Sequence, residues 1–172
     1  MKTKTILVVM NVATYLALVG VAIQGGSKLI SYVVSLNNPE AAKNLYNGLD
    51  LFALQDYSFW HYTAIVSFLV FLDALKVYTC QLVIKVLTDI KLTNPFTPEM
   101  TGLLDKISYV IFSTWLVSFL YNGHRDWLVR RIPGLAMEAI SIDFIFMAGV
   151  VFIIAQVFKR GVEIQSENDL TV

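Results

Sequence analysis

Asp73 and Lys76 are the first residues in the chain whose types and spacing could support ionic chemistry. They follow residues 59–72, a run of apolar and aromatic side chains. Residues three apart lie side by side on a helix, so a carboxylate–ammonium pair is expected. Such a pair inside a bilayer would bind an ion or titrate. At the headgroup level it would instead be structural, with Lys76 reaching water. Depth favours this second interpretation, because Asp73 lies about 22 Å along the helix from Ser58.

Asp143 is the stronger candidate for a charge within the bilayer. The predicted fourth span starts near Leu135, which places Asp143 about 12 Å into it. A carboxylate at that depth faces protein or a water-filled cavity rather than lipid. Its expected partners are Arg125, Arg130 or a tyrosine hydroxyl. Asp143 then either binds a small molecule or ion, or only fixes the packing of the helices. Glu138 is expected at the membrane interface.

No residue pattern in the sequence indicates catalysis. His61 and His124 could meet at a metal together with Glu138, but the His-x-x-x-His spacing of a metal site is missing. There is no glycine-rich phosphate loop and no recognisable triad motif. Cys80 is the single cysteine, which excludes an intrachain disulfide and a cysteine-based metal cage. The sequence therefore predicts a protein that is not an enzyme and needs no metal or cofactor.

The composition points to a bilayer as the surroundings of this chain. Of 172 residues, 56% are hydrophobic and 15% are charged. Soluble domains average about 45–50% apolar and about 25% charged residues. The formal net charge is zero, so no basic field indicates nucleic acid. The expected partner is the lipid bilayer, with no direct contact to nucleic acid.

Four apolar stretches have the length of membrane spans. They cover about residues 6–24, 58–78, 107–123 and 136–158, close to the roughly 20 residues that cross a hydrocarbon core. The first is longer than the apolar part of a signal peptide, so we expect it to remain as a helix. The predicted fold is an all-α, four-helix transmembrane bundle in a single domain, with short interfacial helices and a polar tail at 159–172.

The long connection before the second span is expected to carry a short structure of its own. Asn38 and Pro39 form a helix-start signal within the long connection 25–57. Four aromatic residues near the start of the second span predict an interfacial belt: Tyr57, Phe59, Trp60 and Tyr62.

The distribution of lysine and arginine favours both termini in the cytoplasm. Seven basic residues then lie inside: Lys2, Lys4, Lys85, Lys91, Lys106, Lys159 and Arg160. Five lie outside: Lys28, Lys43, Arg125, Arg130 and Arg131. The difference is small, and the arginine-rich loop 124–134 argues for the opposite orientation.

The C-terminal sequence 164–172, which follows Phe158-Lys159-Arg160-Gly161, carries a family resemblance. Together with the segment 94–97 and the four-span layout, it resembles the bacterial membrane family called domain of unknown function 2975. The resemblance implies an integral protein of the bacterial cytoplasmic (inner) membrane. It also implies a family without an established activity, whose members are often encoded beside a small helix-turn-helix regulator.

Two functions follow as hypotheses. The first is a non-enzymatic regulatory protein that docks a cytoplasmic partner, such as a small helix-turn-helix regulator. The second is a small carrier or ligand-binding protein that uses Asp143, with Asp73 and Lys76 as further binding residues. A polar cavity in the outer half would favour the carrier, and a groove on the inner surface would favour the regulator. The docking residues of the first hypothesis are Asn94, Pro95, Phe96, Asn168, Asp169 and Leu170.

Overall fold

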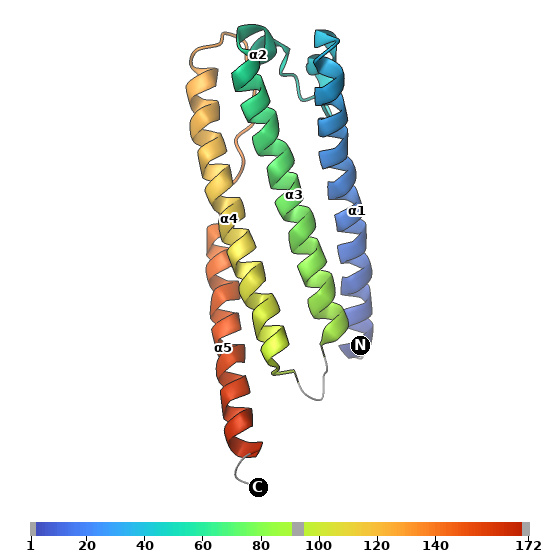
Figure 1. The fold of residues 1–172 in the computed structure, drawn as a ribbon, viewed down its shortest axis with the longest axis vertical. Coiled ribbons are helices and arrows are strands. Elements are labelled where there is room, and N and C mark those ends of the chain that lie inside the picture. The colour runs from blue at the N-terminus through green and yellow to red at the C-terminus, as the bar shows by residue number, and fades with distance from the viewer. Residues whose placement is uncertain (1–2, 91–94, 170–172) are drawn as a thin grey trace. The chain divides into compact units, whose positions relative to one another are not determined.

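The computed structural model describes residues 3–90 and 95–169, and in this part of the chain every regular element is a helix (Figure 1). This confirms the predicted all-α class. The elements are α1 (Thr3–Ser35), the 3-10 helix η1 (Pro39–Asn44), α2 (Phe52–Tyr57), α3 (Phe59–Asp89), α4 (Pro98–Val129) and α5 (Ile145–Asp169).

Four of these helices are long and apolar enough to cross a membrane: Thr3–Ser35, Phe59–Asp89, Pro98–Val129 and Ile145–Glu167. At 1.5 Å per residue, α1 is about 50 Å long, well above the roughly 30 Å of a hydrocarbon core. Many large apolar side chains on α1 and α5 are exposed, among them Leu16 and Phe146. Such side chains suit a chain that is surrounded by lipid.

The chain divides into two compact units, each of which takes parts of several helices. Unit 1 comprises Met1–Leu18, Tyr78–Ser113 and Asp143–Val172, and unit 2 comprises Val19–Val77 and Thr114–Ile142.

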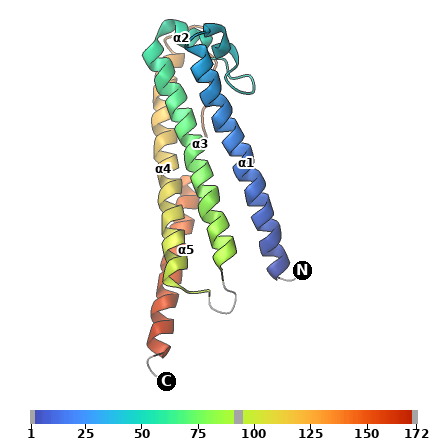
Figure 2. The ribbon, with the colours of Figure 1, turned by 45° about the vertical axis from the view of Figure 1, so that its right-hand side comes forward.

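The core of unit 2 is built largely from the connection between α1 and α3. Asn38 caps η1 by accepting a hydrogen bond from the Glu40 N–H, and Pro39 is its first residue, as the sequence predicts. Within unit 2, α2 lies beside the start of α3 (Figures 1 and 2). Four apolar side chains of this connection are almost completely buried against Tyr62 and Ile65 of α3: Ala42, Leu45, Leu51 and Leu54. The connection is therefore a packed element rather than a loose loop.

Unit 1 has a smaller core. Leu82 of α3 packs with Leu103 and Ile107 of α4, and Val151 of α5 lies against this cluster. Asn11 of α1 donates a hydrogen bond to the Thr88 hydroxyl at 3.3 Å.

The prediction that the fourth helix begins near Leu135 is wrong. Residues 135–142 are extended, and α5 begins only at Ile145. Gly134, which has a φ of 79°, turns the chain into the extended segment. Side chains of α4 then bind the backbone groups that a helix would use internally. At its other end α5 continues through Gly161 to Asp169, so the described part of the predicted tail is helical.

Candidate functional site

Unit 2 contains a cluster of three charges around the buried carboxylate of Asp73. Asp73 of α3 is 2% exposed, and each of its carboxylate oxygens binds one lysine. The Lys28 ammonium of α1 lies 2.7 Å from Oδ2, and the Lys76 ammonium lies 3.2 Å from Oδ1. The Asp73–Lys76 contact is the one that the i, i+3 spacing predicts. Lys28 was missed, because a single sequence does not pair residues on separate helices.

Gly25 allows α1 to approach Asp73 closely. A Cβ atom added at Gly25 would lie 3.1 Å from the Asp73 Cβ, whereas one at Gly26 would meet no atom within 4 Å. The absence of a side chain at Gly25 thus brings the Lys28 backbone near enough for the ammonium to reach the buried carboxylate.

Gly25→Ala is expected to be less stable than Gly26→Ala by about 1–2 kcal/mol. Both changes raise helix propensity by about 1 kcal/mol, but the first also forces a side chain against Asp73. Thermal unfolding of both variants in detergent checks this. Equal stability of the two would contradict the close approach of α1 and α3.

Three side chains of α4 hold the extended segment 135–142. Asn122 makes two hydrogen bonds with Ile140: its Nδ2 donates to the carbonyl at 2.7 Å, and its Oδ1 accepts from the N–H at 2.9 Å. Arg125 donates to the Met137 carbonyl, and the Tyr121 hydroxyl donates to the Glu138 carbonyl at 3.3 Å. Extended backbone inside a membrane protein is tolerated where it is buried in protein or lines a polar cavity.

The extended segment and the charge cluster line the same cavity in unit 2, of roughly 980 Å³. Its charged lining residues are three basic side chains and two acidic ones: Lys28, Lys76, Arg125, Asp73 and Glu138. Polar groups of Gln24, Tyr46 and Asn47 also line it. The cavity has the size of a small-molecule site, and its lining contains one more basic than acidic side chain.

Tyr62 does not belong to the interfacial aromatic belt that the sequence predicts. It is fully buried, whereas Tyr57, Phe59 and Trp60 are between 47% and 79% exposed. Its hydroxyl forms a 2.7 Å hydrogen bond with the Ser35 hydroxyl at the end of α1. A polar tip with a partner inside the core explains why this tyrosine faces inward.

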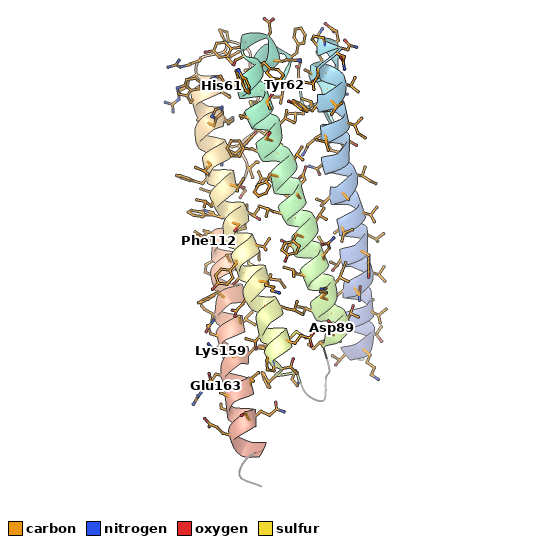
Figure 3. The ribbon with its side chains drawn as sticks, viewed as in Figure 1. His61, Tyr62, Asp89, Phe112, Lys159 and Glu163 are labelled. Atoms are coloured by element: carbon orange, nitrogen blue, oxygen red, sulfur yellow. The ribbon has the colours of Figure 1, made fainter. Side chains whose placement is uncertain are left out.

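His61 and His124 meet in unit 2, with their ring centroids 5.2 Å apart, and Trp127 lies 5.2 Å from His61. Figure 3 labels His61 beside Tyr62 at the start of α3. Within residues 3–90 and 95–169, no group of three or more histidine, cysteine, aspartate or glutamate residues could hold a metal ion. The two histidines thus belong to an aromatic cluster.

Asp143 lies in a turn two residues before α5 and is exposed. Its carbonyl accepts a hydrogen bond from the Phe146 N–H at 3.3 Å, at the start of that helix. The predicted position within the fourth helix is therefore wrong, for the same reason as the helix boundary. Arg125, one of its expected partners, is bound instead to Asp126 at 2.5 Å and to the Met137 carbonyl.

A second candidate site is an apolar groove in unit 1, of roughly 540 Å³. Phe96, which precedes α4, packs against Phe158 of α5, with ring centroids 5.1 Å apart and ring planes tilted by 60°. A Cβ atom at Gly161 would lie 2.6 Å from the Phe96 ring, so only glycine admits this contact. The groove is lined by Phe96, Val157, Arg160, Gly161, Ile164 and Gln165.

The predicted docking residues are placed only in part. Phe96 lies in the groove, and Pro95 precedes it in an extended stretch. Asn94 and Leu170 fall outside the described residues. Asn168 and Asp169 lie on the last turn of α5, and the structure does not describe their side chains.

One of the comparisons with known proteins shows a relationship. The family described as "Protein of unknown function (DUF2975)" matches residues 37–172. No curated protein and no solved structure matches the chain. The matched region includes α3, α4, α5 and both candidate sites except the contributions of α1. The chain therefore belongs to the DUF2975 family.

Proposed function

We propose that this protein is a non-enzymatic membrane protein that docks a helical segment of a cytoplasmic partner in the apolar groove of unit 1. One observation carries the proposal. Helix α5 does not end at Lys159, where its apolar run ends, but continues to Asp169 and forms one wall of the groove there.

The part of α5 that lines the groove carries too many charged side chains to lie in the hydrocarbon core of a bilayer. Lys159, Arg160, Glu163 and Glu167 lie within two and a half turns of α5, where Figure 3 labels Lys159 and Glu163. Charged side chains are costly in the hydrocarbon core, so this part of α5 is expected in water. When a partner covers an apolar groove that is exposed to water, the free energy of the system falls, so such a groove favours binding.

An amphipathic helix is the partner segment that fits best. Such a helix places apolar side chains at i and i+3 or i+4 into a groove. Exposed Ile164 and Phe96 offer the apolar surface, and Arg160, paired with Glu163 at 2.8 Å, offers a polar rim. A small helix-turn-helix regulator, the partner that the family resemblance implies, consists of such helices.

The test measures binding of the full-length protein in detergent to a purified helix-turn-helix regulator of the kind that the family resemblance implies. Replacing Phe96 and Ile164 together with alanine is expected to weaken binding at least about tenfold, because buried apolar anchors dominate such interfaces. Ile142→Ala removes an exposed isoleucine outside the groove and is expected to leave binding unchanged. The proposal fails if the wild-type protein does not bind or if both variants bind as it does. Circular dichroism of each variant verifies that it is folded.

The cavity of unit 2 favours a second candidate function, a small carrier or ligand-binding protein. The specific observation is that buried Asp73 and Lys28 line a cavity of small-molecule size. The binding residues would then be Lys28, Asp73 and Lys76. Asp143, the residue that the sequence favours, is exposed and is not among the lining residues.

A further inference from the structure

We propose that the cavity of unit 2 binds a small anion through a carboxylate or phosphate group, which the ammonium of Lys76 contacts. This inference rests on the ligand-binding candidate function and is independent of partner docking in unit 1.

The charge cluster contains two lysines and one carboxylate, so its formal charge is positive. Lys28 and Lys76 share the single carboxylate of Asp73, one at each oxygen. The side chain of Lys28 is 9% exposed, so its charge is sequestered against Asp73. The side chain of Lys76 is 48% exposed, and its 3.2 Å contact is the longer one. Lys76 is therefore the cation that is available to an anion entering the cavity.

Among the described residues, neither of the other two lining charges forms an ion pair with Lys28 or Lys76. Arg125 is neutralised by Asp126, which lies 2.5 Å away and is not a lining residue. Glu138 is the only other acid of the lining, and it is exposed. An anion beside Lys76 would balance the second lysine of the cluster through a charge-assisted hydrogen bond.

The lining also offers neutral hydrogen-bond donors to an anion. Gln24, Asn47 and Tyr46 carry donor groups. Of the extended segment, the carbonyls of Met137, Glu138 and Ile140 are bound by side chains of α4. Within the described ranges 3–90 and 95–169, the N–H groups of residues 136–139 donate to no backbone carbonyl. Backbone N–H groups beside a cavity are suited to the oxygens of a carboxylate or phosphate.

Two sources can supply this chemistry: a free metabolite and the headgroup of an anionic lipid. Isothermal titration of the detergent-purified, full-length protein with inorganic phosphate and with succinate tests the first source. The second source is tested in nanodiscs of phosphatidylglycerol or of phosphatidylcholine, followed by native mass spectrometry of the retained lipid. Putrescine and glucose serve as a cationic and a neutral probe.

Binding of phosphate, succinate or phosphatidylglycerol is expected, and Lys76→Met should weaken it about tenfold to a hundredfold, the value of one charge-assisted hydrogen bond. Glu138→Gln should raise the affinity, because it removes a negative charge from the lining. Lys43→Met, at an exposed lysine outside the cavity that pairs with Glu40, should have no effect.

Three outcomes would overturn the inference. Binding of only putrescine or glucose would show that the site takes a ligand that is not an anion. The inference would then be wrong, whereas the ligand-binding candidate function would still be supported. Anion binding that Lys76→Met leaves intact would place the anion elsewhere. If no probe binds in detergent or in nanodiscs, both the ligand-binding candidate function and the inference are contradicted.

Discussion

Asp73→Ala is expected to lower the free energy of unfolding by about 3–5 kcal/mol, the usual cost of removing one partner from a buried ion pair. The carboxylate of Asp73 is buried, and Lys28 beside it is nearly as inaccessible. Without the carboxylate, the Lys28 ammonium remains in a largely desolvated position with no counter-charge. Unfolding followed by circular dichroism in mixed micelles measures the loss.

Two further variants separate this effect from a general loss of packing. The combination of Lys28→Met with Asp73→Leu replaces both charges by apolar side chains of similar volume and should restore most of the stability. Glu40→Ala breaks the exposed Lys43–Glu40 pair, whose side chains are 51% and 63% exposed, and should cost less than about 1 kcal/mol. An Asp73→Ala variant that is no less stable than Glu40→Ala would show that the buried pair is not a stabilising contact.

Asn122→Ala is expected to cost about 2–4 kcal/mol and to release the extended segment 135–142. The change leaves the N–H and the carbonyl of Ile140 without their partners, at about 1–2 kcal/mol for each of these half-buried groups. Hydrogen exchange at the Ile140 amide should accelerate, since its proton is then no longer bound to Oδ1. Amide exchange measured by mass spectrometry, with peptides that cover 135–142, reports the release.

The matched control for Asn122→Ala is Asn11→Ala. Asn11 makes one exposed hydrogen bond of 3.3 Å to Thr88, so its removal is expected to cost less than about 1 kcal/mol. Unchanged exchange at Ile140 in Asn122→Ala would mean that Tyr121 and Arg125 alone hold the segment.

The fold class could be predicted from the sequence because bilayer-spanning helices need long apolar runs. Such runs can be recognised from the order of the residues alone. The contact between Asp73 and Lys76 was also predictable, because it depends only on helical spacing. The contact of Asp73 with Lys28 was not, because the two residues are 45 positions apart and only the packing of α1 on α3 joins them.

The extended segment shows a different limit. Residues 135–142 are mostly apolar, and an apolar run without clear periodicity reads equally as a helix or as an extended strand. The choice is made by Tyr121, Asn122 and Arg125, which bind the carbonyls of the segment from α4. Because these side chains delay the start of α5, Asp143 lies in an exposed turn and not inside a helix as predicted. Errors in the candidate site therefore followed directly from this one boundary.

The spacing of Lys28 and Asp73 along the chain has a consequence for biosynthesis. Ribosomes add about 5–20 residues per second, so the lysine leaves the ribosome roughly 2–9 seconds before the aspartate that neutralises it. A lone lysine in an apolar helix raises the cost of transfer into lipid. We therefore expect the first helix to be retained at the translocon until α3 arrives, so that the two helices enter the bilayer together as a neutralised hairpin.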